Sequence, residues 1–238
     1  MQATDTKSGF KMALMTHDFS TIKRIIKRSF PVLEEDGIKA RVLDSENPEE
    51  VEEYEGFRYH YWIDKFKYIQ APKRDDKHEH DKYDDHSFHF GALKDDNLIG
   101  YSRFILPGHH GLQVHREFEE LVHPRIKVPI DMAKCVESSR LVVVPELGSK
   151  RHQVAQMIYK LKYQFMKRFG YRYWYHVSEA KLTRALRMQK FPFEIIGEGK
   201  EYQGAICYPS LMDLDKVDEI LRKERPEYYV WLNEGFDK

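Results

Sequence analysis

The most informative pattern along the chain is a short, unbroken run of aliphatic and β-branched residues, Leu141 to Val144, which Pro145 closes. A run of this kind, without polar alternation, is typical of a strand that is buried on both faces. Two charged residues, Glu137 and Arg140, stand just before it. Burying an ionisable group is costly unless it is paired or hydrogen-bonded, and a carboxylate in such a place often has a chemical role. This stretch therefore predicts a central strand that carries functional side chains.

Helices are predicted where apolar residues recur every three or four positions and capping signals flank the repeat. In the clearest case Val154, Ile158, Leu161 and Phe165 share one stripe, and Gly170 ends the helix. The predicted helices cover residues 17–30, 47–66, 117–122, 151–169 and 178–189 with Ser178 as its cap, followed by a C-terminal helical extension at about 213–238.

Strands are predicted where short apolar runs are bounded by turn residues. They cover residues 39–43, 87–93, 98–106, 136–144, 171–177, 191–196 and 201–208. The alternation of helices and strands predicts an α/β fold, with helices flanking a mixed central sheet. Since no repeat, low-complexity tract or linker interrupts the pattern, residues 1–238 are expected to form a single domain.

Composition narrows the class of protein without indicating a function. The 238 residues include 41% hydrophobic side chains, enough for a substantial core. Lys plus Arg and Asp plus Glu both number 39, so overall charge does not favour a nucleic-acid partner. No apolar run reaches the ~18 residues of a membrane span, and the two cysteines match no disulfide framework. A cytoplasmic protein with no integral membrane segment is expected.

A dense run of charged residues between Lys73 and Asp85 lacks apolar periodicity and is predicted to be a loop. Its imidazole and carboxylate side chains are of the types that bind divalent metals. Their spacing, however, matches no metalloprotease helix motif. A solvated loop, or one at the edge of a substrate site, is therefore the favoured interpretation, and no metal site is predicted.

A candidate anion site follows the central strand. Gly148, Lys150 and Arg151 stand in the segment that leads into the helix at 151–169. Backbone N–H groups and the helix dipole attract anions at such a position, and two cations would reinforce them. The same residues fit a solvated loop equally well.

Five short motifs occur in the order in which they stand in the acyl-homoserine lactone synthases, and the middle of the chain therefore resembles that family. They are Arg58 with Trp62, Glu79-x-Asp81-x-x-Asp84, Gly100-x-x-Arg103, Phe118-x-x-Leu121 and Glu137-x-x-Arg140. A closer likeness is to the acyltransferases associated with the PEP-CTERM/exosortase system, which are relatives of the N-acyl amino acid synthases. It rests on residues 81–89, on Glu179-x-x-Leu182-x-Arg184 and on residues 193–197.

The resemblance implies a GNAT-type acyltransferase fold, in which two central strands splay apart to admit the pantetheine arm of an acyl donor. Here those strands would be residues 137–144 and 171–177. The donor would be acyl-ACP, in which the acidic acyl carrier protein holds the chain, or acyl-CoA, and Lys150 and Arg151 would contact its phosphate. No tightly bound cofactor is implied.

The same resemblance implies that the acceptor is the amine of an amino acid or of a similar small molecule. Beyond Gly170 the chain departs from the lactone synthases, which disfavours S-adenosylmethionine as the acceptor. A lactone synthase that uses S-adenosylmethionine stays an alternative. A second alternative is a non-catalytic GNAT-fold module that binds an acyl carrier or a lipid.

Amide formation from a thioester needs a base for the amine, a stabilised oxyanion and a proton for the thiolate. Glu137 is the predicted base, acting directly or through a water, and Arg103 is the predicted ligand of an acceptor carboxylate. Backbone N–H groups of Leu141, Val142 and Val143 would face the thioester carbonyl. The other residues assigned to the site are Arg58, Trp62, Asp81, Asp84, Arg140, Glu179 and Tyr175, with Tyr173 or Tyr175 as a proton donor to sulfur.

Two structural questions stay open at this point. The charged motif residues could all belong to one structural ion-pair network, in which Glu137 would be a partner of Arg58 or Arg140. In addition, side chains alternate along a strand, so Glu137 and Arg140 share a face only if a bulge separates them. Such a bulge is expected from the resemblance.

Overall fold

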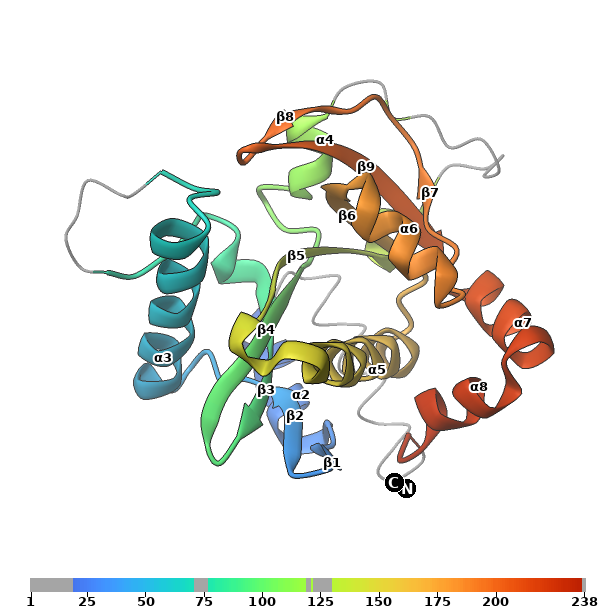
Figure 1. The fold of residues 1–238 in the computed structure, drawn as a ribbon, viewed down its shortest axis with the longest axis horizontal. Helices are drawn as coiled ribbons and strands as arrows, with labels where there is room; N and C mark the ends of the chain where they lie inside the picture. Colours follow the sequence, from blue (N-terminus) through green and yellow to red (C-terminus); the bar gives the residue numbers. More distant parts are fainter. Residues whose placement is uncertain (1–18, 71–76, 119–120, 122–129, 237–238) are drawn as a thin grey trace.

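The computed structural model describes residues 19–70, 77–118, 121 and 130–236. As predicted, helices flank a mixed sheet, whose strand order is β1-β2-β3-β4-β5-β6-β9-β7, with β8 paired to β9 (Figure 1). The described pairings are antiparallel except that of β5 with β6. The strands are β1 (Leu33–Glu35), β2 (Ile38–Val42), β3 (Ser87–Lys94), β4 (Asn97–Ile105), β5 (Cys135–Val143), β6 (Tyr173–Glu179), β7 (Glu194–Ile195), β8 (Lys200–Tyr202) and β9 (Ala205–Asp213).

The longest helix, α5 (Arg151–Phe169), covers one face of the sheet. Its apolar stripe packs with Phe104 and Trp174 in the main core, and Gly170 ends it with a φ of 77°. The opposite face packs against α3 and α4 through Tyr101 and Tyr175. The remaining described helices are α2 (Phe19–Ser29), α3 (Pro48–Arg58), the π-helix η1 (Tyr59–Lys65), α4 (Gln113–Glu117), α6 (Ala180–Met188), α7 (Leu214–Glu224), α8 (Pro226–Asn233) and three short 3-10 helices, η2 (Asp84–His86), η3 (Met132–Lys134) and η4 (Pro145–Lys150).

Several predicted boundaries are wrong because tertiary pairing overrides local propensity. Ser178, the predicted cap of α6, lies inside β6, where it pairs with Tyr208 of β9. The predicted strand at 201–208 is a hairpin of β8 and β9, and the strand predicted at 191–196 is reduced to β7. The short helix predicted at 117–122 overlaps α4 only at Glu117: the backbone of Phe118 is extended, and residues 119, 120 and 122 lie outside the described residues.

The strands β5 and β6 separate partway along their length. They pair in parallel from Cys135 with Tyr173 to Ser138 with His176, although both continue beyond this point. Farther along, β5 stays with β4 and β6 stays with β9. The predicted splay of the central strands is therefore confirmed.

The expected bulge lies in β5 between Ser139 and Val142. Tyr101 pairs with Val142 and Arg103 with Ser139, so β5 holds one more residue than β4 over this interval. Arg140 sits in the bulge with a φ of 56°, an uncommon backbone conformation for a non-glycine residue. The extra residue changes the alternation of side chains, and Arg140 reaches the face of the sheet that carries Arg103.

Candidate active site

A cavity of about 470 Å³ lies in the gap between the splayed strands, and its size is within the range of small-molecule sites. β5 contributes Ser138, Ser139, Arg140 and Leu141 to the wall, and β6 contributes residues 176–179. Ser138 occupies the last paired position of β5 with β6. The cavity therefore begins where the parallel pairing ends.

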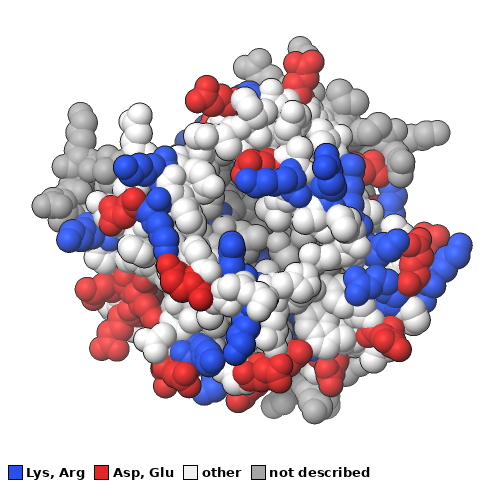
Figure 2. Space-filling model, viewed as in Figure 1, with Lys and Arg blue, Asp and Glu red and all other residues white. Residues whose placement is uncertain are grey.

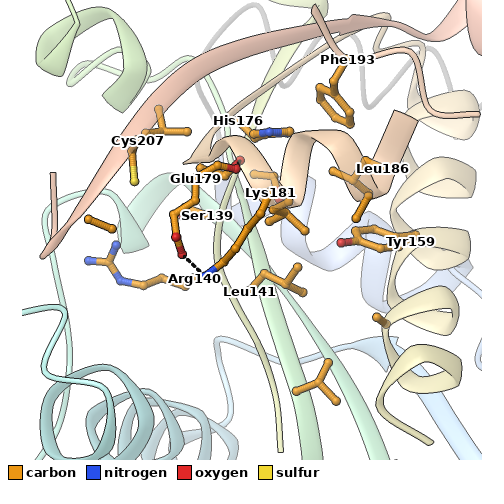
Figure 3. A pocket seen from close by; sticks show the side chains of 18 of the residues that line it. Ser139, Arg140, Leu141, Tyr159, His176, Glu179, Lys181, Leu186, Phe193 and Cys207 are labelled. Atoms are coloured by element: carbon orange, nitrogen blue, oxygen red, sulfur yellow. Dashed lines mark hydrogen bonds and ion pairs between the residues drawn. The ribbon is translucent and has the colours of Figure 1, made fainter. Parts of the chain in front are cut away.

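The two sides of the cavity differ in chemistry. Tyr159 from α5 and Leu186 from α6 lie together on one side, and Arg140 lies on the other (Figure 3). Leu182 adds to the apolar side. The guanidinium of Arg140 lies over the ring of Trp62, 5.3 Å from its centre, and Trp62 also lines the cavity. The cavity thus connects an apolar region under α5 and α6 with an aromatic and cationic region on the opposite face of the sheet.

Cations stand at the helix starts beside the cavity. Arg151 at the beginning of α5 and Lys181 at the beginning of α6 are exposed and line the wall. Lys181 pairs with Glu179 at 2.9 Å. Figure 2 shows Lys and Arg side chains around a hollow near the middle of this view. Of the two predicted phosphate ligands, Arg151 therefore lies at the cavity, and Lys150 is exposed at the preceding position.

Asp84 is the centre of a buried ion-pair network. Its Oδ1 accepts hydrogen bonds from Arg58 Nη1 at 2.7 Å and from Arg103 Nη1 at 2.6 Å, and its Oδ2 accepts from Arg58 Nη2 at 3.1 Å. Both arginines are fully buried. Burial alone would raise the pKa of the Asp84 carboxyl, but the guanidinium groups of Arg103 and Arg58 hold that pKa well below its ordinary value.

Arg140 joins the same network from β5. Its Nη2 donates to Glu79 and to Asp81, each at 3.0 Å. Arg58 also pairs with Glu79, and Arg103 makes two hydrogen bonds to Asp81, of 2.8 and 2.6 Å. Three buried cations and three carboxylates therefore neutralise one another, so the charged motif residues other than Glu137 form one structural network.

The charged run at the start of β3 is not the solvated loop that its composition predicts. Glu79 and Asp84 are each 5% exposed, because arginines from α3, β4 and β5 neutralise them. Residues 73–76 of that run lie outside the described residues. In the described ranges no group of three or more His, Cys, Asp or Glu side chains is arranged to hold a metal.

Glu137 lies on the same face of the sheet as Arg103, in an apolar region of its own. It is 1% exposed, and its Oε2 accepts a hydrogen bond from the backbone N–H of Val114 at 2.8 Å. Burial raises the pKa of Glu137 to about 8. Glu137 and Arg140 therefore have different partners. Glu137 is not among the residues that line the cavity, whereas Ser138 and Ser139, the next two residues of the strand, are.

The predicted substrate contacts divide into two groups. Trp62, Leu141, Val143 and Glu179 line the cavity, together with Arg140. The second group lies behind the wall: Arg58, Asp81, Asp84 and Arg103 in the network, Val142 opposite Tyr101, and Tyr173 and Tyr175 in a buried cluster under α4. Burial raises the pKa of both tyrosine hydroxyls, and neither tyrosine is among the residues that line the cavity.

Sequence reasoning missed His176 and Lys162. His176 lines the cavity, and burial lowers its pKa to about 3, so its imidazole is neutral. Lys162 is fully buried under the sheet. A signal for Lys162 was present, because a cation between Ile158 and Phe165 interrupts the inward stripe of α5. His176 lies in an aromatic strand and carried no signal of its own.

Residues 58–215 match the family model described as N-acyl amino acid synthase FeeM. No curated protein matches the chain. Within the described residues, no helix is both long and apolar enough to cross a membrane. The link to the PEP-CTERM/exosortase system stays a prediction.

Solved structures with a similar fold include a CoA-dependent acyl-homoserine lactone synthase, BjaI, with SAM and isopentyl-CoA. It is 18% identical, with a TM-score of 0.63 over 77% of this chain and 87% of that chain. TofI, in a complex with an inhibitor and MTA, is 19% identical, with a TM-score of 0.60 over 75% and 96% of the two chains. The AHL synthase LasI is 12% identical, with a TM-score of 0.60 over 74% and 90%.

These structures support the predicted fold class. Because their sequence identities to this chain are low, they show a similar fold and nothing about function. The family model, in contrast, spans both splayed strands, the charged motifs and the helices beside the cavity. Because it covers more than half of the chain, the protein belongs to the FeeM family of N-acyl amino acid synthases and is an acyltransferase.

Proposed function

We propose that this protein transfers a fatty acyl chain from the thioester of acyl carrier protein or coenzyme A to the amine of an amino acid. Acyl transfer to an amine follows from the family. The observation that carries the finer assignment is the cavity, which is apolar under α5 and α6 and cationic beside Arg140. An acyl chain fits the first environment, and the carboxylate of an amino acid fits the second.

Arg140 and Trp62 are the proposed ligands of the acceptor carboxylate. Arg140 uses Nε and Nη2 for carboxylates of the network, and among the described residues Nη1 has no hydrogen-bond partner. The buried indole N–H of Trp62 also has no partner there. A guanidinium nitrogen without a partner and a buried indole N–H both favour a ligand that supplies acceptors. Arg103, for which this role was predicted, is instead assigned to hold the network behind Arg140.

Glu137 keeps its proposed role as the base. A carboxyl with a pKa near 8 is a stronger base, once deprotonated, than an ordinary carboxylate. Glu137 and Ser139 share a face roughly 7 Å apart along the strand, so a water would pass the amine proton to it. The bulge at Arg140, and the departure of β6, expose backbone N–H groups between Leu141 and Val143 for the oxyanion.

The donor is assigned to the α5 and α6 side. Its phosphate would rest at the start of α5, where Lys150 and Arg151 add charge to the helix dipole. Arg151 and Lys181 would also attract an acidic carrier protein. The acyl chain would then lie along Tyr159, Leu182 and Leu186.

The test is a product assay. Purified protein is incubated with decanoyl-ACP or decanoyl-CoA and a mixture of the standard amino acids, and the extract is examined by mass spectrometry. N-decanoyl amino acids and an equal amount of thiol are expected. Release of methylthioadenosine on addition of S-adenosylmethionine would identify a lactone synthase instead. Donor binding without any turnover would support the non-catalytic module.

Enlarging Leu182 is expected to shorten the acyl chains that the enzyme accepts. Leu182 is half-buried and lines the apolar side of the cavity, so Leu182→Trp fills space that a long chain needs. We expect kcat/KM for a myristoyl donor to fall about tenfold relative to that for a butyryl donor. Met188→Trp is the matched control, because Met188 is 76% exposed on the same helix. Equal loss with both donors would contradict this placement of the chain.

A further inference from the structure

Lys162 is a buried lysine that has no carboxylate partner among the described residues. It is 0% exposed, and its Nζ hydrogen-bonds to Ser102 Oγ at 2.7 Å, Ser138 Oγ at 2.5 Å and the backbone oxygen of Arg103 at 3.3 Å. Its Nζ also lies 4.1 Å from the centre of the Phe104 ring. Burial lowers the pKa of Lys162 well below its ordinary value. A lysine in this condition exchanges its proton at a pH where ordinary lysines do not.

The hydrogen bonds of Lys162 connect its charge state to one atom of the cavity wall. The carbonyl of Arg103 can only accept, and Ser102 Oγ donates its own hydrogen to the carbonyl of Ser139 at 3.3 Å. Lys162 therefore donates to both. The direction of the third hydrogen bond, between Lys162 Nζ and Ser138 Oγ, depends on the charge of Lys162. A charged Lys162 donates this bond, and the Ser138 hydroxyl hydrogen can then point into the cavity. A neutral Lys162 accepts the bond from the Ser138 hydroxyl.

We propose that Ser138 and Lys162 form the proton relay that protonates the departing thiolate of the acyl donor. The proposal rests on the proposed function, because it assigns the step that a thioester substrate requires. Ser138 lines the cavity at the point where the strands separate and faces α5. The donor side of the cavity lies on that same side of the sheet, where Tyr159 and Leu186 contribute to the wall.

The relay balances the reaction. As the tetrahedral intermediate collapses, the C–S bond breaks and its electron pair stays on sulfur. The sulfur takes the Ser138 hydroxyl proton, and Ser138 takes one from the Lys162 ammonium. The amine proton has meanwhile passed to Glu137. Afterwards Glu137 releases a proton to water and Lys162 regains one through Ser138, so the net change is thioester plus amine to amide plus thiol.

Adjacent residues on one strand would thus serve opposite sides of the sheet. Alternation turns Glu137 toward α4 on the acceptor side and Ser138 toward α5 on the donor side. Within the part of the chain that the structure describes, the ionisable side chain that interacts with Lys162 is His176 of β6, which lies on the same face of the sheet and is neutral. Arg103 and Glu137 point to the opposite face. The base and the acid are therefore kept apart by the strand itself.

The test varies the leaving group. Lys162→Met and Ser138→Ala are compared with the wild type on two decanoyl thioesters, one of pantetheine and one of 4-nitrothiophenol, with the mixed amino acids as acceptors. The pantetheine thiolate needs a proton to leave, whereas the far less basic nitrothiophenolate does not. We expect both variants to slow the pantetheine reaction roughly 100-fold and the aryl reaction less than about threefold. The double variant should be no slower than either single variant.

Lys160→Met is the matched control, because Lys160 is also buried on α5 but lies 4.5 Å from the Trp231 ring centre, in the C-terminal part of the chain. Lys160→Met should change the rates with the pantetheine and the aryl thioester by the same factor. Equal losses on both donors in Lys162→Met and Ser138→Ala, or no loss, would overturn the relay. If Lys162→Met does not fold, Ser138→Ala carries the test, since Ser138 is only half-buried. A wild type that acylates no amino acid would instead refute the proposed function.

Discussion

Replacing Glu137 by glutamine is expected to lower kcat about 100- to 10,000-fold, which is the range for loss of a general base. Glutamine keeps the shape of the side chain, and its amide oxygen can still accept the hydrogen bond from Val114 that positions α4. The variant should therefore fold and bind both substrates. The measurement is steady-state acyl transfer with decanoyl-pantetheine and mixed amino acids.

The pH dependence separates a base from a structural carboxyl. In the wild type, kcat should rise with pH up to about 8, as Glu137 loses its proton, and then level off. In Glu137→Gln this rise should be lost. Glu224→Gln is the control, because Glu224 is an exposed carboxylate paired with Lys190. A Glu137→Gln variant that folds and keeps full turnover would exclude Glu137 as the base.

Stability provides an independent check on the same carboxyl. The pKa of Glu137 is raised in the folded state, so the stability that its protonated form contributes is complete below the unfolded pKa and is lost as pH rises through about 8. A shift of this size corresponds to roughly 3–5 kcal/mol. As the pH is raised from acidic to alkaline, the Tm of the wild type should therefore fall relative to the Tm of Glu137→Gln measured at the same pH.

Replacing Asp84 by asparagine is expected to reduce the free energy of unfolding by about 3–5 kcal/mol. Asparagine has the same shape but no charge, so Arg58 and Arg103 would remain fully buried without the carboxylate that they share. Removing one partner of a buried ion pair costs more than the pair itself contributes, because the remaining charge stays desolvated. Urea unfolding at neutral pH measures the loss.

The control for Asp84 is again Glu224→Gln, which breaks an exposed ion pair and should change the free energy of unfolding far less than Asp84→Asn does. Since the pKa of Asp84 is held well below its ordinary value, its contribution is present above the unfolded pKa and is lost as pH falls through the folded pKa. The difference between Asp84→Asn and the wild type should shrink in acid. A loss no larger than that of the control would show that the network does not stabilise the fold.

The order of helices and strands could be read from the chain because it depends on local signals. The apolar stripe of α5 and its end at Gly170 depend on residues that are neighbours in sequence. The start of α3 does too, because the Asn47 side chain accepts a hydrogen bond from the backbone N–H of Glu49. Where pairing partners are distant the prediction failed. Ser178 has the local character of a helix cap, yet it pairs with Tyr208 thirty residues later.

The candidate site shows the same division. The charged residues of the buried network could be named from the sequence, since charged groups beside a buried strand are costly and therefore informative. Their partners could not. The pairing of Arg140 with Glu79 and Asp81 depends on a bulge and on a segment some sixty residues earlier in the chain. Lys162 acquires its unusual state from Ser102 and Ser138, which only the packing of α5 brings to it.

What the sequence determined by itself is therefore a set of residue types in order: a buried strand, the charges at its entrance and the helices around it. Which of those charges face each other, and which face the cavity, was decided by tertiary structure. The bulge in β5 places Arg140 on the face of the sheet that carries Arg103, and the separation of β5 from β6 brings Ser138 to the cavity wall. The physical reason is that register and pairing depend on distant strands, whereas propensity and the alternation of side chains depend on neighbours in sequence.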